Sequence, residues 1–320
     1  MLKFIVSTVN PDYNSKSIAV IMCTKNGATY IEEQLYSLSK QMHKNMDIYI
    51  SDNGSNDKTV TLIKKFTKKN YVKIFLVRGG SIHFANSFIN LTQLIKKNYD
   101  YYAFCDQDDV WDSCHTLRAI KKIEKTSLNI PALYCSRTNL IDKQGIKIGK
   151  SKLFNKKPSF NNALVQSIAG GNTMVFNRLA FDLLEGVKSE KNFIPSHDWM
   201  LYLLVSGCGG FIHYDKRPSV NYRQHENNAI GSNLGIFNTL KRVNLIYNGA
   251  WTNWLDSNYK ILKNTSELTQ ENLCYLESFQ RLRKIDNIFI RLKEYSRSTI
   301  YRQTLFGRFS ILVALIIKKL

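Results

Sequence analysis

An alternation of strand and helix patterns near the start of the chain limits the possible folds more than any other feature of the sequence. Apolar runs of five to seven residues alternate with amphipathic segments of about a dozen residues. The apolar runs lie at residues 17–23, 46–51, 72–77 and 100–105, and the amphipathic segments at 29–41, 57–69 and 84–97. This order predicts βαβ units and a mostly parallel sheet flanked by helices. In such sheets, ligands bind beyond the carboxyl ends of the strands.

Acidic turns follow two of these expected strands. "SDNGSND" comes after the second strand, and "CDQDDVWD" (Cys105–Asp112) after the fourth. The second turn holds four carboxylates in eight residues, in a chain of formal net charge +20. Neighbouring carboxylates make each other costly to ionise, and a divalent cation such as Mg²⁺ or Mn²⁺ would remove that cost and bind a diphosphate. The alternative is a solvated acidic loop that caps the next helix. Both turns are expected to face one crevice.

Composition restricts the class of protein without choosing a function. The 320 residues, 44% of them hydrophobic, suit one large domain or a domain with an appendage. Six cysteines without a C-x-x-C pair predict reduced thiols, and we find neither a signal-peptide pattern nor an apolar run near 18 residues. We therefore expect a cytoplasmic protein. The excess of 45 Lys and Arg over 25 Asp and Glu suits nucleic acid, anionic lipid or phosphorylated substrates.

The last quarter of the chain differs from the rest. Residues 235–320 read as helical and hold 14 Lys and Arg against 6 Asp and Glu. We therefore divide the chain into a domain over 1–234 and a helical extension over 235–320. The chain ends with an apolar run, Phe309–Ile317, before two lysines. This run is too short to span a bilayer, and two interpretations stay open: it lies on an anionic membrane surface, or it docks on the core as a last helix.

Six segments together carry a family resemblance. They are "CTKNGATYIEEQLYSL", "ISDNGSNDKT", "FCDQDDVWD", "GGNTMVF", "HDWMLYLL" and "YRQHENNAIG". Their order and spacing over about residues 17–232 resemble family-two glycosyltransferases with the α/β GT-A fold, and most of all bacterial rhamnosyltransferase-type members that build surface polysaccharides. The resemblance implies an inverting, metal-dependent transfer of one sugar from a nucleotide-diphosphate sugar, with dTDP-rhamnose favoured, to a glycan or polyprenyl-linked acceptor. Transfer of another sugar, such as glucose or galactose from a UDP donor, is the alternative.

The resemblance also implies roles for matching residues. The residues expected at the donor nucleotide are Thr24, Asn26, Asp52, Asn53, Arg78 and Asp106. Asp108 and His225 are expected to hold the divalent cation, Mn²⁺ or Mg²⁺. Asn53 stands where relatives carry an acid, so the preferred nucleobase stays open, although an amide can still pair with a base edge.

The remaining expected roles concern catalysis and the acceptor. Asp198 matches the general base, and one base is enough for direct attack with inversion. From the residues alone, Asp198 could instead cap the helix that follows it. The diphosphate or acceptor contacts are expected from Gly170, Gly171, His197, Trp199 and Arg223.

Other classes of protein fit the sequence less well. A nucleotidyltransferase would want a glycine-rich phosphate loop after the first strand, and "CTKNGAT" has one glycine. A nucleic-acid-binding protein would show a basic stripe with interleaved aromatic residues, and the tail could pass for one. We expect no nucleic acid and prefer an anionic membrane surface as the partner of the tail, since acceptors in such pathways are often lipid-linked. Processive synthases add transmembrane helices and a Q-x-x-R-W motif, both absent from this sequence. We therefore expect single-sugar addition at the inner face of the cell membrane.

Overall fold

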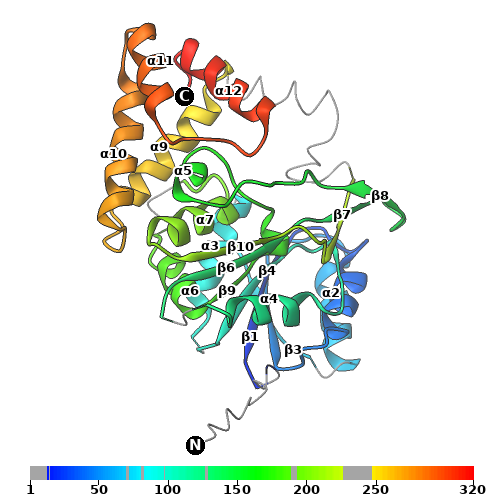
Figure 1. Cartoon of the computed structure of the whole chain (residues 1–320). Helices are drawn as coiled ribbons and strands as arrows, with labels where there is room; N and C mark the ends of the chain where they lie inside the picture. The colour runs from blue at the N-terminus through cyan, green and yellow to red at the C-terminus, as the bar shows by residue number, and fades with distance from the viewer. Residues whose placement is uncertain are drawn as a thin grey trace, which may run out of the picture.

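A twisted central sheet organises the protein (Figure 1). The computed structural model describes residues 13, 15–69, 72–80, 83–96, 98–126, 129–188, 193–225 and 247–320. Within this part, seven strands form the sheet in the order β10-β6-β9-β4-β1-β2-β3. They are β1 (Ile18–Thr24), β2 (Met46–Asp52), β3 (Lys73–Arg78), β4 (Tyr101–Cys105), β6 (Ala132–Ser136), β9 (Val175–Asn177) and β10 (Phe211–Asp215). The first four are parallel, as predicted, whereas β9 runs antiparallel to both of its neighbours.

Helices cover both faces of this sheet, which explains why its strands are continuous apolar runs. Alternate residues of β1 point to opposite faces: Ile18, Val20 and Met22 join one buried cluster, and Ala19 and Ile21 the other. The first cluster lies under α1 (Ile31–Ser39), α2 (Thr59–Lys69) and α4 (His115–Ile123). The second lies under α3 (Phe84–Leu94), α6 (Arg178–Glu185) and α7 (His197–Gly207).

A smaller sheet stands beside the carboxyl end of β4. Its order is β5-β11-β7-β8, with β5 (Val110–Trp111), β11 (Val220–Arg223), β7 (Asn139–Ile141) and β8 (Lys147–Lys150). Since β5 follows the acidic turn directly and pairs with β11, the turn is fixed next to the residues that end β11. The short helix α5 (Phe160–Ala163) and the 3-10 helix η1 (Gly171–Thr173) complete this part of the chain.

Four helices of the C-terminal extension pack against the sheet-containing part at one end of the molecule (Figure 1). They are α9 (Ala250–Lys263), α10 (Gln270–Lys284), α11 (Ile288–Arg297) and α12 (Leu305–Ile316). Buried residues of α9 and α12, such as Trp251 and Ile311, belong to the same apolar cluster as α7. Hydrogen bonds also join the two parts, for instance from Asn162 Nδ2 to the carbonyl of Tyr301 at 3.0 Å. The expected boundary between residues 234 and 235 lies outside the described residues.

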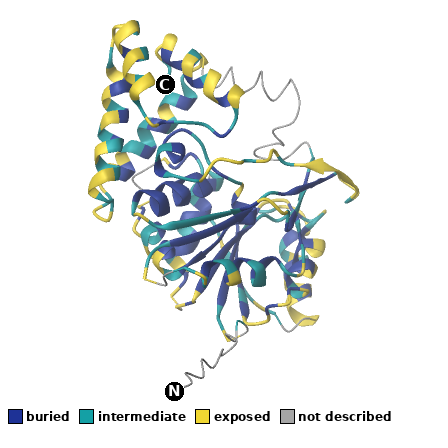
Figure 2. Ribbon diagram, in the orientation of Figure 1, coloured by how far each residue is buried: buried dark blue, intermediate teal, exposed yellow. Residues whose placement is uncertain are grey.

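The last helix combines features of both interpretations that the sequence left open. Gly307, Ile311, Ala314 and Leu315 are buried against the core, so α12 is docked. Its opposite side carries exposed apolar side chains. Figure 2 shows exposed residues along the outer helices of the extension. In the described part of the chain, we find no helix with the length and apolar character needed to cross a membrane.

Candidate active site

The two acidic turns meet at one edge of the sheet, as the parallel order requires. β1 lies between β2 and β4, and Thr24 at its end pairs in register with Asp52. The side chain of Gln107, in the second turn, bridges to the end of β1. It accepts a hydrogen bond from the backbone N–H of Lys25 at 3.0 Å and donates one to the Lys25 carbonyl at 3.2 Å. The two acidic turns are therefore neighbours at this edge, whereas a crevice that they share stays a prediction.

The first turn is organised around Asp52. Its buried carboxylate accepts hydrogen bonds from Thr24 Oγ1 at 3.1 Å, from the Ser55 N–H at 3.0 Å and from Ser55 Oγ at 2.5 Å. Asn26 adopts a positive φ of 49°, and its Oδ1 accepts the N–H of Asn56 at 2.9 Å. These side chains hold the turn rigid at the expected donor site. Direct contact of Thr24, Asn26 and Asp52 with a donor stays a prediction.

Asn53 and Arg78 lie on the outer side of this turn. Arg78 pairs in register with Asp52 at the exposed end of β3. The Oδ1 atom of Asn53 is buried and has no hydrogen-bond partner among the described residues. It packs on Gly79, where an added Cβ would lie 2.1 Å away. A buried amide oxygen without a hydrogen-bond partner is costly in free energy, and the predicted contact of Asn53 with the nucleotide stays a prediction.

The four carboxylates of the second turn are buried to different degrees, and Asp106, Asp108 and Asp112 stay half-buried. Asp109 is fully buried and accepts hydrogen bonds from Asn172 Nδ2 at 2.5 Å and from the Arg223 backbone N–H at 3.0 Å. Burial, together with the charges of Asp108 and Asp106, holds the pKa of Asp109 well above its ordinary value. Burial and the charges of Asp108 and Asp198 likewise raise the pKa of Asp106 to about 7. The solvated acidic loop that we considered from sequence is therefore not what forms.

Asp108 and His225 come together, as expected for a shared metal. His225 Nε2 lies 2.8 Å from Asp108 Oδ2. Neighbouring ligands of an octahedral cation with bonds near 2.1 Å stand about 3 Å apart, so the pair fits two adjacent positions. Within the described ranges, no group of three or more His, Cys, Asp or Glu side chains is arranged to hold a metal. The remaining ligands would have to be substrate or water oxygens, which is the usual situation for Mg²⁺.

Arg223 has a role that differs from the predicted one. Its guanidinium is 1% exposed and donates to Glu33 Oε2 at 2.6 Å, to the Asp108 carbonyl at 2.9 Å and to the Lys143 carbonyl at 3.1 Å. It also lies over the ring of Tyr30, with its central carbon 4.5 Å from the ring centroid. These contacts do not support the predicted diphosphate contact. The correction is that Arg223 ties α1 and the β7–β8 turn to the backbone of the acidic turn.

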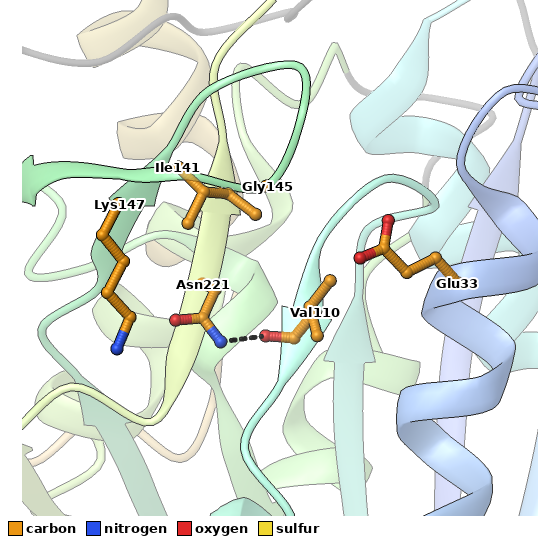
Figure 3. Close-up of a pocket in the computed structure, with 6 residues that line it drawn as sticks. All are labelled: Glu33, Val110, Ile141, Gly145, Lys147 and Asn221. Carbon is orange, nitrogen blue, oxygen red and sulfur yellow. Dashed lines mark hydrogen bonds between the residues drawn. The ribbon is translucent and has the colours of Figure 1, made fainter.

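A shallow pocket lies on the outer side of this arginine (Figure 3). It has a volume of about 130 Å³. It is lined by Glu33, Val110, Ile141, Gly145, Lys147 and Asn221. Figure 3 shows Glu33 and Lys147 on opposite sides, and Asn221 donating to the Val110 carbonyl. None of the four turn carboxylates lines this pocket, although Val110 of the same turn does.

Asp198 lies in the first turn of α7, where the sequence left two roles open. Its Oδ1 accepts the Trp199 N–H at 2.5 Å and the Ser196 hydroxyl, and its Oδ2 accepts the Gly171 N–H at 3.1 Å. The residue in the N-cap position is Ser196. A carboxylate oxygen has two acceptor positions, so Oδ1 can hold the helix while Oδ2 keeps one position for a proton. Burial raises the pKa of Asp198 in spite of these hydrogen bonds.

The segment around η1 joins Asp198 to the acidic turn. The Gly171 N–H bonds to Asp198, and the next side chain, Asn172, bonds to Asp109. A Cβ on Gly171 would lie 2.5 Å from His197 Nε2, and one on Gly170 would lie 2.7 Å from Asn172 Oδ1. Both glycines are therefore required by close approach of other groups. Their predicted contacts with substrate stay predictions.

The sequence profile of Glycosyl transferase family 2 matches residues 19–184, slightly more than half of the chain. The chain belongs to this family. The matched region contains both acidic turns and the η1 segment, whereas Asp198, Arg223 and His225 lie beyond it. The assignment of the last three therefore depends on the geometry and on relatives whose similarity extends over more of the chain.

This glycosyltransferase has relatives that match most of its length. The dTDP-rhamnosyl transferase RfbG of Shigella flexneri is 29% identical over 293 residues, which cover 85% of this chain and 98% of that protein. An uncharacterized glycosyltransferase of Haemophilus influenzae is 23% identical over 272 residues, 80% of each chain. The rhamnosyltransferase-like character predicted from sequence is thereby confirmed.

Solved structures confirm the GT-A fold. S. aureus TarS 1-349 in complex with UDP superposes with a TM-score of 0.52 at 13% identity, over 83% of this chain and 71% of that one. The mannosyltransferase PcManGT from Pyrobaculum calidifontis, in complex with GDP-Man and Mn²⁺, superposes with a TM-score of 0.51 at 14% identity. The superposition covers 95% of this chain and 87% of that one. At such identities the likeness concerns the fold alone.

Two predicted contacts of this family 2 enzyme turn out to be buried supports. Trp199 is 6% exposed, and its Nε1 donates to the Ala163 carbonyl at 2.6 Å, so it fills the core instead of contacting an acceptor. His197 is stacked on Phe88 with centroids 3.9 Å apart, and burial lowers its pKa to about 3. The imidazole is therefore neutral, and it packs against Gly171. Both corrections have the same physical cause, which is that the side chains point into the apolar core.

Three residues that matter for the site were not predicted. Asn172 holds Asp109, Glu33 neutralises Arg223, and Tyr30 lies against both Arg223 and His225, with a centroid distance of 5.4 Å to the latter. Asn172 follows the two glycines of "GGNTMVF", so its neighbours already marked the segment. For Glu33 and Tyr30 the sequence gives no such signal, because they lie almost 200 residues from their partners along the chain.

Proposed function

We propose that this enzyme transfers one sugar, with inversion, from a nucleotide-diphosphate sugar to a glycan or lipid-linked acceptor in cell-surface polysaccharide biosynthesis. The favoured donor is dTDP-rhamnose. The observation that carries the proposal is that the η1 segment links Asp198 to the acidic turn, since the Gly171 N–H donates to Asp198 Oδ2 at 3.1 Å and Asn172 Nδ2 donates to Asp109 at 2.5 Å. The similarity to RfbG over nearly the whole of both chains supports the choice of donor.

Asp198 is the proposed general base. The Gly171 N–H fixes the orientation of Oδ2, and the raised pKa makes the carboxylate a better proton acceptor than an exposed Asp. The acceptor hydroxyl would give its proton to Asp198 as its oxygen attacks the anomeric carbon. The bond between the anomeric carbon and the diphosphate breaks at the same time, and the diphosphate leaves on the face opposite the attacking oxygen. A single carboxylate is enough for this inverting step, since no covalent sugar–enzyme intermediate needs a second one.

Asp108 and His225 are the proposed ligands of a divalent cation, Mn²⁺ or Mg²⁺. When bound, the cation supplies electrostatic stabilisation to the leaving diphosphate. The 2.8 Å separation of the two side chains fits adjacent ligand positions. The role of Arg223 is to hold the Asp108 backbone, and Tyr30 limits the movement of the His225 ring.

The first turn is the proposed nucleotide site. Thr24, Asn26 and Asp52 form its rigid floor, and Asn53 is suited to a base N–H. We place Arg78 beside the nucleotide and Asp106 beside the ribose. Gly170 and Gly171 would bring backbone close to the sugar or the acceptor. We also propose that the enzyme works in the cytoplasm at the inner face of the cell membrane, where a polyprenyl-linked acceptor is found.

A donor screen with the purified enzyme tests these proposals. The unfolding temperature is measured with dTDP-, UDP- and GDP-sugars, each with Mn²⁺, with Mg²⁺ and with a chelator. We expect dTDP-rhamnose to stabilise the protein only when a cation is present, because binding to the native state raises its stability. Stabilisation by UDP-sugars alone would replace the donor assignment. Equal stabilisation in chelator would exclude the cation role of Asp108 and His225. NMR of the product shows whether its anomeric configuration is inverted relative to the donor.

A further inference from the structure

The outer side of α12 presents a continuous apolar stripe to solvent. Its members are Leu305, Phe309, Leu312 and Ile316, spaced four, three and four residues apart. At 100° per residue they occupy an arc of about 60°. Leu305 is 82% and Phe309 62% exposed. The stripe lies opposite the side that docks on the core, so docking of α12 against the described residues does not bury it.

The preceding helix, α11, also exposes large apolar side chains. The Lys318 ammonium contacts Asp286, so the start of α11 lies beside the end of α12. The first turn of α11 exposes Phe289, which is 80% exposed, and Ile290. We call these two residues and the four of the α12 stripe the α11–α12 face. Its exposed area is concentrated in large side chains, unlike the scattered single apolar residues of an ordinary surface.

Basic residues outnumber acidic ones in the segment that carries the α11–α12 face. Residues 284–320 hold eight Lys or Arg and two Asp or Glu. Both acids already have basic partners, since Asp286 contacts Lys318 and Glu294 lies 3.2 Å from Arg297. Exposed Arg308 adjoins Phe309 within the stripe. Apolar side chains together with basic residues match the acyl boundary and the headgroups of an anionic bilayer.

We propose that the α11–α12 face docks flat on an anionic membrane, with its apolar side chains at the level of the acyl boundary and its basic residues among the headgroups. Charge complementarity favours lipid over an apolar protein groove, which would leave the basic residues unpaired. Because α12 shares its buried core with α7, the docked helix and the catalytic part form one packed unit. The proposal deepens the proposed function by naming the surface that brings the enzyme to a lipid-linked acceptor, and it rests on that function only for the acceptor.

Vesicle flotation of the full chain tests the docking without any donor. The probes are phosphatidylcholine vesicles and vesicles in which about a third of the lipid is phosphatidylglycerol. The test variant is Phe309→Ser with Leu312→Ser. Its control is Ile146→Ser with Ile148→Ser, which removes two exposed apolar side chains near and on β8. We expect the wild type and the control to float with anionic vesicles only, and the test variant to lose at least tenfold in partitioning.

Three outcomes would overturn the proposal. They are equal flotation of the test variant and the wild type, wild-type flotation that ignores lipid charge, and a wild-type oligomer that the test variant dissociates. Unfolding curves show whether each variant is folded. If the double variant is not, the single variant Phe309→Ser replaces it in the flotation assay. Failure of the proposed function is separate, since it would appear as absent sugar transfer in a protein that still floats. Retained transfer by the test variant to a water-soluble acceptor would support a docking role alone.

Discussion

Replacing Arg223 by Lys tests whether this residue supports the acidic turn or binds the diphosphate. Lys keeps the positive charge but has no planar fork, so it can replace at most part of the bonds to Glu33, Asp108 and Lys143. Hydrogen bonds from a charged donor contribute roughly 1.5–3 kcal/mol each. The Glu33 side chain is 52% exposed, which reduces the value of the ion pair to about 1 kcal/mol or less. We therefore expect the free energy of unfolding to fall by about 2–4 kcal/mol.

The effect on ligand binding separates the two roles. If Arg223 supports the turn, the loss of one bond to the Asp108 carbonyl should weaken Mn²⁺-dependent donor binding by about tenfold, or about 1.4 kcal/mol. Binding of a nucleoside diphosphate in chelator should then change little. Glu33→Gln should have a smaller effect, because the guanidinium keeps its bonds to the two carbonyls. Calorimetric titration of the donor with and without Mn²⁺ measures the cation-dependent and the cation-independent affinity.

A surface arginine provides the matched control. Arg217 also pairs with a carboxylate, Asp215 at 3.2 Å, but its side chain is 68% exposed. Arg217→Lys should therefore leave both the stability and the donor binding nearly unchanged, because exposed ion pairs contribute little. The reasoning is refuted if Arg223→Lys behaves like the control. It is also refuted if Arg223→Lys weakens nucleoside diphosphate binding equally in chelator, which would restore the direct diphosphate contact.

Three further predictions address the site directly. Asp198→Asn should reduce kcat by at least about a hundredfold while the donor affinity is preserved. The wild-type rate should fall on acidification at a pH above the usual carboxyl range, because the raised pKa of Asp198 lets the base become protonated there. Weaker donor binding instead would make Asp198 structural. Asp108→Ala should abolish the cation dependence of donor binding in calorimetry, and unchanged dependence would remove it from the metal pair. Gly171→Ala should lower activity, since its Cβ would lie 2.5 Å from His197 Nε2, whereas Gly186→Ala, with 3.5 Å to its nearest neighbour, should not.

Much of the fold follows from local pattern. The strands from β1 to β4 were predictable because buried parallel strands are apolar on both faces and alternate with helices. Their parallel order also places the two acidic turns at one edge. The antiparallel β9 was not predictable, because its three residues carry no directional signal. Its direction depends on how the chain returns between β4 and β6, which is a tertiary property.

The candidate site was predictable in its residue positions but less so in its side-chain directions. Asp108 and His225 meet although 117 residues separate them, and the family pattern places both. Trp199 and Arg223 belong to equally specific motifs, yet both point into the protein. A motif fixes where the backbone lies, whereas burial of the whole side chain depends on neighbours from distant segments, such as Ala163 and Glu33.

The folded protein also explains how acids can cluster in a strongly basic chain. Burial and mutual repulsion raise the pKa of Asp106 and Asp109, so the turn is costly to ionise without a cation. A lysine or arginine bonded to these carboxylates would remove that cost and compete with the cation. Arg223, the buried cation beside them, instead donates to Glu33 and to backbone carbonyls. The turn thus gains support from an arginine whose guanidinium leaves the turn carboxylates open to the proposed divalent cation.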